Sequence, residues 1–473
     1  MNNVIRRRLK RKARSPENKG GPGERLGTAV VVTLVLTAFI ATLAYGAVDP
    51  WANGMLAILA AVIILLWIAH AWRSGALNIN VTLLLLPLAA WVVIGMVQLL
   101  PLRTDPEAAA ILGIPVSSAL SLDPYATRMF TVRLVIMLVF FAAALTFFDS
   151  LKKIELATLS IVIFGAALAF FGVLQKLSGT TEIYGMRKVE QTFPFGTFVN
   201  QHHFAALMEM ISGLAIAMLI GPGVTRERRI FVGLAAALMG IVIVFTGSRG
   251  GMLSYIGVIA VVTVLTSVRR SDTPKTQSAS VARLAAFGGG AALLIGVIAV
   301  AFFLGGGSDL FRGFGPQAGD ITSGRTHFWS VGWQIFTHYP IIGAGFDAFG
   351  AAFTRFDTWN GMYRIEQAHN DYLQTLADAG IAGFICVIGF IYLIARTSLT
   401  VIARSTGDVR TNIAIGALAG CTGIFIHSLF DFPLRTTSNA FFFLLLVAFA
   451  CVDVADKTKN SGGRRRASNQ SAG

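Results

Sequence analysis

Residues 53–72 read NGMLAILAAVIILLWIAHAW, twenty positions without a single Asp, Glu, Lys or Arg. A helix that crosses about 30 Å of hydrocarbon needs roughly 20 mostly apolar residues, so this stretch predicts a membrane-spanning helix. Because it is continuous rather than alternating, a helix is favoured over a barrel strand. Eleven further runs of this kind lie near 27–46, 81–101, 128–148, 155–177, 204–221, 230–246, 251–267, 284–304, 372–395, 411–430 and 437–454.

The composition of the whole chain supports the same class of fold. Of 473 residues, 55% are hydrophobic and only 13% are charged, and the mean hydropathy is +0.68. We therefore predict an all-α integral membrane protein with about twelve transmembrane helices. Cys386, Cys421 and Cys451 all fall inside predicted spans, so they give no disulfide or metal framework. The first apolar run is too long for the core of a cleavable signal peptide.

The distribution of basic residues orients the chain. If the N-terminus is cytoplasmic, 27 of the 39 Lys and Arg residues fall in inner segments, and every inner loop is basic. The net charge of +15 then reflects this asymmetry and attraction to anionic membrane lipids. Nucleic-acid binding is the competing interpretation of the Arg6–Arg14 run, but that tail adjoins a span and lacks interleaved aromatic residues. We expect both termini in the cytoplasm, at a bacterial inner membrane, and no nucleic-acid partner.

This topology divides the chain into five parts. They are a basic cytoplasmic tail over 1–26, nine helices over 27–304, a large periplasmic loop over 305–371, three helices over 372–455 and a second basic tail over 456–473. In the loop we expect one amphipathic helix over 325–337, capped by Ser323, and another over 346–356. On the first, Phe328, Trp329, Trp333 and Phe336 are expected on one side. The loop is interpreted as a lid on the outer leaflet, and the alternative is a loop packed on its own helices.

Three residues of the predicted outer face carry the strongest chemical signal. Arg249 lies in TGSRGG (246–251), Arg325 in SGRT (323–326) and His369 in AHND (368–371). Guanidinium groups bind phosphate oxygens with two parallel donors, and imidazole is suited to accept a proton from a hydroxyl. The glycines after Arg249 would open a helix whose amino end favours anions. Together they predict a pocket that binds a diphosphate and activates an alcohol.

Each of the three also has a structural interpretation. Arg249 could be an interfacial anchor, Arg325 could form a loop salt bridge, and His369 could be a capping or hydrogen-bonded residue. Asn370 and Asp371 could cap the following helix or orient the imidazole.

Several other residues are weaker candidates. The spacing of His427 and Asp431 would let them pair on one helix face. The adjacent His202 and His203 diverge on a helix and cannot chelate one metal together. Arg128 and Arg133 could bind anionic lipid or anchor a helix, and Glu209 is an ionisable residue inside a span. No histidine spacing suits a metal, so arginine is favoured over a divalent cation as the phosphate ligand, and no cofactor is expected.

At these residues the chain resembles the O-antigen ligase family, which includes related polysaccharide polymerases. The matching pieces are FVNQHHFA (198–205), TGSRGG (246–251), SGRTHFW (323–329), AHNDYLQ (368–374) and HSLFDFPL (427–434). The resemblance implies a metal-independent glycosyltransferase with an undecaprenyl-diphosphate-linked glycan as donor. It implies Arg249 and Arg325 as diphosphate ligands and His369 as the base. The doubled His202–His203 departs from the single histidine expected there, which leaves His202 without an implied role.

The acceptor remains open at this stage. A ligase would use lipid A-core, a polymerase another glycan, and a protein-glycosylating variant a Ser or Thr hydroxyl. The alternative of another class is a multi-pass transporter or flippase of lipid-linked glycans. Against it, the ionisable residues gather at the predicted outer interface rather than at mid-membrane.

Overall fold

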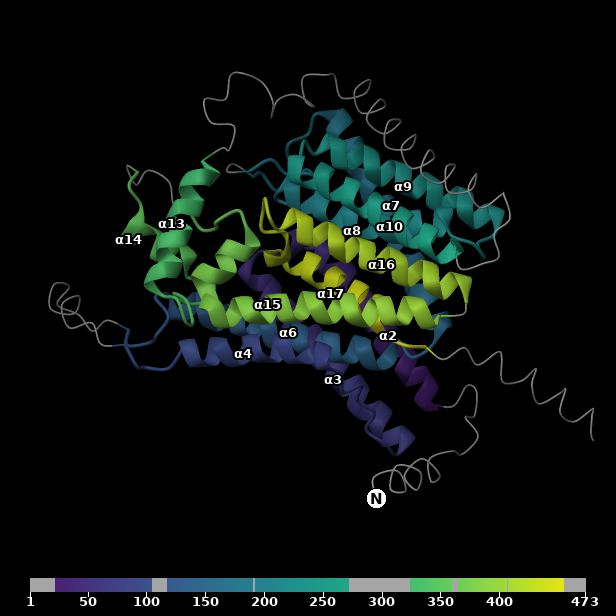
Figure 1. Ribbon diagram of the computed structural model, residues 1–473, viewed down its shortest axis with the longest axis horizontal. Helices are drawn as coiled ribbons and strands as arrows, with labels where there is room; N and C mark the ends of the chain where they lie inside the picture. Colours follow the sequence, from purple (N-terminus) through teal and green to yellow (C-terminus); the bar gives the residue numbers. More distant parts are fainter. Residues whose placement is uncertain are drawn as a thin grey trace, which may run out of the picture.

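The computed structural model describes residues 22–103, 117–189, 192–271, 324–359, 365–405 and 407–454. Within these ranges the regular structure is helical, as predicted, and extended pairing is limited to two isolated bridges. Figure 1 shows the long helices lying side by side, with α13 and α14 at one end. The helices are α2 (Pro22–Leu43), α3 (Pro50–Ser74), α4 (Leu86–Gln98), α6 (Pro124–Phe147), α7 (Leu151–Ser178), α8 (Gln201–Ile220), α9 (Arg226–Phe245), α10 (Arg249–Ser271), α13 (Arg325–His338), α14 (Phe349–Phe356), α15 (Asp371–Arg404), α16 (Asp408–His427) and α17 (Thr437–Cys451), with single 3-10 turns at Tyr45–Ala47, Leu83–Leu85 and Pro433–Arg435.

Nine helices in the described part of the chain are long and apolar enough to cross a membrane. The predicted spans at 81–101 and 437–454 instead correspond to the shorter apolar helices Leu83–Gln98 and Thr437–Cys451. The first begins where Thr82 caps its opening turn, and Asn80 just before it is hydrogen-bonded to Thr146 and Leu145 of α6. The predicted span at 284–304 lies outside the described residues. A total of twelve therefore stays a prediction.

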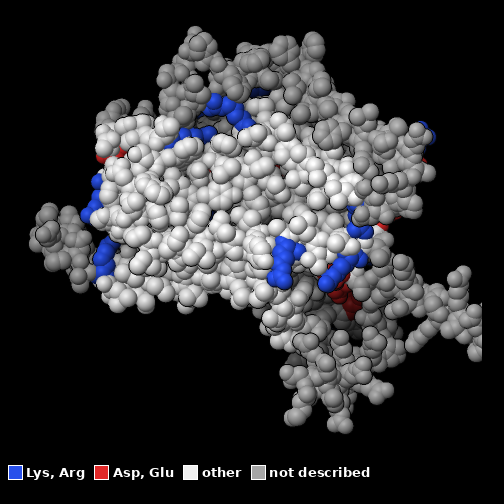
Figure 2. Space-filling model, in the orientation of Figure 1, with Lys and Arg blue, Asp and Glu red and all other residues white. Residues whose placement is uncertain are grey.

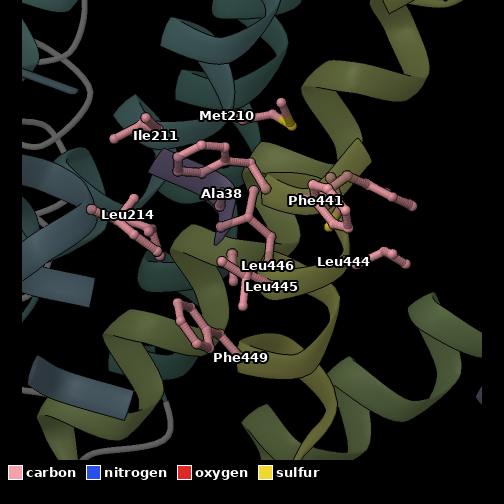
Figure 3. Packing of buried hydrophobic residues seen from close by; sticks show 14 of the residues in the cluster. Ala38, Met210, Ile211, Leu214, Phe441, Leu444, Leu445, Leu446 and Phe449 are labelled. Carbon is pink, nitrogen blue, oxygen red and sulfur yellow. The ribbon is translucent and has the colours of Figure 1, made fainter. Parts of the chain in front are cut away.

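Close contact between α8 and α16 forms the centre of the bundle. A Cβ on Gly416 would lie 2.6 Å from the carbonyl oxygen of Gly213, and one on Gly420 would lie 2.6 Å from that of Met210. Small residues four apart let two membrane helices approach until their backbones touch. Because the hydrophobic effect does not drive helices together in lipid, van der Waals packing of this kind stabilises the pair. The buried helix α17 lies beside this pair, and Figure 3 shows its phenylalanines and leucines among side chains of α8.

The outer surface fits an apolar environment. The face shown in Figure 2 is largely free of charged side chains among the residues that are drawn in colour or white. Large side chains such as Ile58, Leu65 and Trp72 of α3 are exposed. Exposed apolar surface of this extent on helices of spanning length is expected of a lipid-facing bundle.

Helix α15, which begins at Asp371, is broken at Gly380. Gly380 has φ 62° and ψ −163°, a conformation open to glycine alone. The segment 340–345 fills the gap with four main-chain hydrogen bonds. Ile381 and Ala382 donate to the carbonyls of Pro340 and Ile341, while Ala344 and Gly345 donate to those of Ala377 and Asp378. Main-chain hydrogen bonds between α15 and the loop therefore stabilise the break at Gly380.

The loop helices agree with the sequence in position but not in orientation. Helix α13 covers the predicted 325–337 with one more residue, whereas α14 begins at Phe349 instead of 346, because Asp347 adopts a left-handed conformation with φ 60°. The N-cap of α13 is Gly324 with φ 81°, and Ser323 lies outside the described residues.

The prediction of one aromatic face on α13 was wrong. Phe328, Val331 and Ile335 are buried in a cluster with residues of α14 and α15, while Trp333 is 54% exposed. The described part of the loop is thus packed on its own helices, which was the alternative interpretation. Its predicted place on the periplasmic side stays a prediction.

Candidate functional site

A single buried carboxylate joins two of the predicted site residues. Asp431 follows the last turn of α16, and its Oδ1 lies 3.1 Å from Nδ1 of His369. Its Oδ2 lies 3.9 Å from a guanidinium nitrogen of Arg325. The structure therefore brings His369 and Arg325 together around Asp431.

The backbone at His369 explains why its ring can reach Asp431. His369 has φ 51°, an uncommon conformation for a residue other than glycine that usually persists only where surrounding contacts impose it. Those contacts come from its two successors. Asn370 caps α15 by accepting from the amides of Tyr372 and Leu373, as predicted, and donates to the carbonyl of Leu429. Asp371 accepts from the Ser428 hydroxyl at 2.9 Å.

The ring of His369 is oriented for proton transfer through one nitrogen. Phe328 stacks on it at 6.0 Å, and Phe432 meets it edge-on at 4.9 Å. Because Nδ1 is directed at the Asp431 carboxylate, Nδ1 carries the proton in the neutral ring and Nε2 is left as the basic nitrogen. The side chain of His369 is 29% exposed, so a substrate can approach it.

Asp431 is held in its charged form. Burial by itself raises the pKa of a carboxyl group, but the hydrogen bond from His369 and the neighbouring histidines lower it by more. The net effect places the pKa of Asp431 well below its usual range. The group is therefore an anion beside an imidazole, the arrangement that stabilises an imidazolium once His369 takes up a proton.

Arg249 is the first residue of α10, and three residues separate it from the end of α9. The two helices are therefore joined by a tight turn. A Cβ on the following Gly250 would lie 3.1 Å from the imidazole of His427 and 3.4 Å from Phe430. The amino end of α10 thus rests on the same turn, 427–431, that carries Asp431.

Comparison with known proteins covers this region. Residues 234–388 match a family model described as O-antigen ligase. This segment is similar to the O-antigen ligase family and spans less than half of the chain. Together with the nine apolar helices, this match supports a multi-pass bacterial membrane protein that is an enzyme of the O-antigen ligase type. No curated protein matches the chain.

The matched segment contains the three principal predicted site residues and omits Asp431, which contacts two of them. Arg249, Arg325 and His369 lie inside 234–388, whereas Asp431 lies beyond it. The carboxylate that binds His369 is therefore supplied to the matched segment by the turn after α16.

The predicted pairing of His427 with Asp431 is wrong. Nδ1 of His427 lies 3.2 Å from both carboxylate oxygens of Glu209 on α8, and both side chains are buried. Helix α16 ends at His427, so residues 428–431 form a turn and the helical spacing no longer applies. His427 is therefore directed at Glu209, and Asp431 at His369.

The two adjacent histidines of α8 have separate environments. His203 is buried, with its Nδ1 2.6 Å from the Thr436 hydroxyl and its ring against Phe432. His202 is less buried and within electrostatic reach of Asp431, Arg325, His369 and His427. Asp431, His369 and His427 are also within electrostatic reach of His203, so His202 differs from it by greater exposure and by its proximity to Arg325. Residues one apart on a helix point about 100° apart, and only the tertiary contacts decide which one faces inward.

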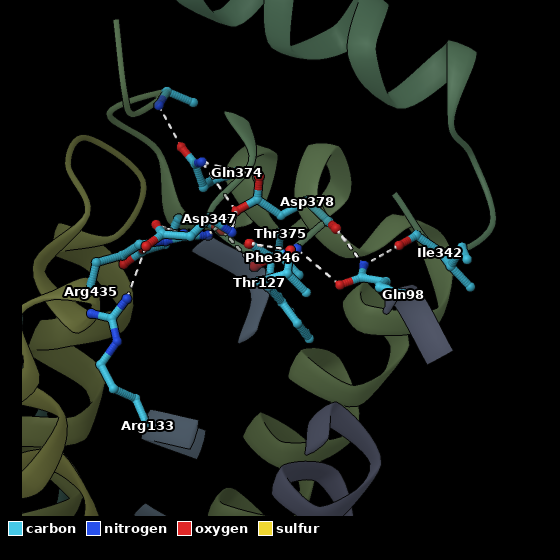
Figure 4. A network of polar contacts seen from close by, with 12 residues as sticks. Gln98, Thr127, Arg133, Ile342, Phe346, Asp347, Gln374, Thr375, Asp378 and Arg435 are labelled. Carbon is cyan, nitrogen blue, oxygen red and sulfur yellow. Dashed lines mark hydrogen bonds and ion pairs between the residues drawn. The ribbon is translucent and has the colours of Figure 1, made fainter. Parts of the chain in front are cut away.

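A second charged cluster was missed altogether. Arg435 donates to Asp347 at 3.0 Å and to Asp378 at 2.6 Å, and Arg133 donates to Asp347 at 2.9 Å. Figure 4 shows this network, with the Gln98 side chain bound to Ile342, Phe346 and Asp378 on its far side. Burial raises the pKa of Asp347, but the two arginines outweigh it and the net pKa is lowered. Arg133 is therefore a structural cation, and Arg128 is exposed on α6.

An apolar cavity lies beside this network, between α4, α6, α15 and α17. Its walls include Trp91, Met137, Phe390 and Phe443. Asp371 and Ser428, which are hydrogen-bonded to each other, form part of its polar end. The cavity therefore adjoins the segment that carries His369.

Proposed function

We propose that this chain transfers a glycan from undecaprenyl diphosphate to an acceptor hydroxyl on the periplasmic face of the inner membrane. The family match supports an O-antigen ligase-type enzyme, and the donor, the metal independence and the stereochemistry are the proposal. Outside the cytoplasm there is no ATP, so the energy must come from the donor itself. Diphosphate is a good leaving group and meets this need.

The proposed reaction is a single displacement with inversion. Nε2 of His369 takes the proton of the acceptor hydroxyl while that oxygen forms a bond to the anomeric carbon. The bond from this carbon to the diphosphate oxygen breaks, and the electron pair leaves with the diphosphate. Arg249 and Arg325 stabilise the charge that builds on it. Preorganised cations at a developing anion are typically worth about 3–4 kcal/mol each.

The observation that supports this proposal most is the shared contact at Asp431. Its carboxylate binds the imidazole of His369 on one oxygen and lies near the guanidinium of Arg325 on the other. A base and an anion ligand that share one buried carboxylate are held at a fixed separation. The family match, together with a base and an anion ligand at one carboxylate, supports transfer over transport.

The test uses purified protein in nanodiscs, with polyprenyl-linked glycan and candidate acceptors. Arg249→Ala, Arg325→Ala and His369→Ala should each abolish transfer while the protein still inserts and melts normally. Two matched controls are available on the loop helices, His338→Ala for the histidine and Arg355→Ala for the arginines, since both side chains are exposed. Wild-type glycan output from a well-expressed triple variant would rule out the proposal.

Acceptor identity is decided by the same assay. Lipid A-core, a second lipid-linked glycan and a Ser- or Thr-containing peptide represent the ligase, the polymerase and the protein-glycosylating variant. Product from only one of them assigns the acceptor class.

A further inference from the structure

Trp359 is an exposed aromatic side chain beside the candidate site. It follows α14, and its indole is 47% exposed. Its six-membered ring closely approaches Gly324, where an added Cβ would lie 3.1 Å away. Gly324 immediately precedes Arg325. The indole therefore lies next to the start of α13, from which Arg325 extends towards Asp431.

The indole is held rigidly by a second histidine–aspartate pair. His327 stacks on it with the ring centroids 4.1 Å apart and the planes 7° from parallel. Nε2 of His327 lies 2.7 Å from Oδ1 of Asp357, and the same oxygen accepts the amide of Trp359 at 3.0 Å. Asp357 thus fixes both the imidazole and the backbone of the residue stacked on it.

These contacts leave one face of the indole open. His327 covers the other face, and Phe328 meets the indole at 64° with the centroids 5.8 Å apart. Phe328 in turn stacks on His369 at 6.0 Å. Trp359 and His369 therefore both contact Phe328, and the exposed surface of the indole belongs largely to the face that His327 does not cover.

A flat, rigid, exposed aromatic face has a matching ligand in the chemistry of this site. One side of a pyranose ring presents several C–H groups, which carry slight positive charge. The face of an indole is negative because of its quadrupole. A sugar ring that stacks on the indole buries apolar surface on both partners and keeps its hydroxyls in water.

We propose that Trp359 is the platform for the donor sugar, stacking on the pyranose ring attached to the diphosphate. The inference rests on the proposed function, in which Arg325 holds the diphosphate. Trp359 packs against Gly324, the residue that immediately precedes Arg325. Trp359 then binds the substrate, and His327 and Asp357 are positioning residues. The platform contributes to recognition of the glycan and takes no part in proton transfer.

The test compares two lipids on one protein. His369→Ala protein in nanodiscs is titrated with undecaprenyl diphosphate alone and with the same lipid carrying its glycan, so that no turnover occurs. Adding Trp359→Ala should weaken binding of the glycan-bearing lipid by roughly 3- to 10-fold and leave the bare lipid unchanged. Trp359→Tyr should restore most of the lost affinity.

Trp333→Ala is the matched control, since Trp333 is an exposed tryptophan on α13 that contacts Phe336 instead. It should change neither affinity. Equal weakening of both lipids by Trp359→Ala would mean a membrane anchor or a structural role and would overturn the proposal, as would no change in either.

The binding readout also separates this proposal from the proposed function. If wild-type protein binds the glycan-bearing lipid with the expected dependence on Trp359 but transfers nothing, the platform stands and the transfer reaction fails. If transfer occurs and binding ignores Trp359, the transfer reaction stands and the platform fails.

Discussion

Nδ1 of His369 and Oδ1 of Asp431 lie 3.1 Å apart although 62 residues separate them in the chain. Two structural features create this contact. A left-handed backbone at His369 turns its ring away from α15, and the end of α16 at His427 frees the next four residues to turn towards it. The candidate base and its carboxylate partner therefore meet at the open end of the hairpin formed by α15 and α16, where one precedes the first helix and the other follows the second.

Asp431→Asn should lower kcat by on the order of 10²- to 10⁴-fold with little change in KM, because an amide cannot stabilise the imidazolium and can select the wrong tautomer. The measurement is initial-rate kinetics on protein whose melting temperature matches the wild type. Asp149→Asn, which alters an exposed pair with Lys153, is the control and should leave kcat unchanged. A kcat within twofold of wild type for Asp431→Asn would remove Asp431 from the mechanism.

The network around Asp347 should give a pH-dependent contribution to stability. The folded-state pKa of Asp347 is lowered, since burial is outweighed by Arg435 and Arg133. A lowered pKa stabilises the folded state at pH values above the unfolded pKa of about 4, and this contribution is lost as pH falls through the folded value. The difference in melting temperature between wild type and Asp347→Asn should therefore be constant from pH 5 to 8. It should shrink below about pH 4. A difference that grows on acidification would contradict this sign.

The glycine contact between α8 and α16 should not tolerate a methyl group. Gly416→Ala would place its Cβ 2.6 Å from the Gly213 carbonyl oxygen, so the helices must separate, at a cost of roughly 1–3 kcal/mol. Gly389→Ala on α15 has no atom within 4 Å of the new Cβ and should be neutral or slightly stabilising. Thermal unfolding in the same detergent measures both. Equal stability of the two variants would show that the close contact does not hold the bundle together.

Glu209 and His427 should behave as one unit. Either residue changed alone leaves a polar partner buried without a hydrogen bond, which costs more than the pair contributes. The double variant Glu209→Leu, His427→Leu should therefore be less destabilised than the sum of the single changes. We expect a coupling of about 1–3 kcal/mol in a double-mutant cycle. Strict additivity would show that the 3.2 Å contact between His427 and Glu209 contributes no coupling free energy.

Transfer should not depend on a divalent metal. Because guanidinium groups are proposed to neutralise the diphosphate, dialysis against EDTA should leave the rate unchanged. Complete loss that Mg²⁺ restores would contradict this part of the proposal.

Local patterns predicted the elements, and tertiary contacts decided how side chains meet. The runs of apolar residues located the long helices because hydrocarbon thickness fixes their length. The pairing of His427 could not be found in this way, since its partner Glu209 lies on α8. Spacing along one helix favoured Asp431, and that helix ends too early. No local pattern marks Arg435, because its partners Asp347 and Asp378 come from two distant segments.

The same distinction applies to the candidate site. Arg249, Arg325 and His369 were proposed from residue type and motif, and the structure places His369 and Arg325 around one carboxylate. The face of α13 was misjudged because its most conspicuous residues are aromatic. The neighbours Val331 and Ile335 are buried instead, since they share a helix face with Phe328 and that face meets α15.

The break at Gly380 has a practical consequence for engineering. The four main-chain bonds that join 340–345 to 377–382 cross between the loop and a membrane helix, so the loop is not a detachable module. A chimera that exchanges the loop between two such enzymes, to alter which sugars they accept, should include the first three turns of α15 in the transplanted piece. Junctions placed at residue 371 would take the donors and acceptors of these hydrogen bonds from different proteins, and the hybrid would lose the register between the loop and α15.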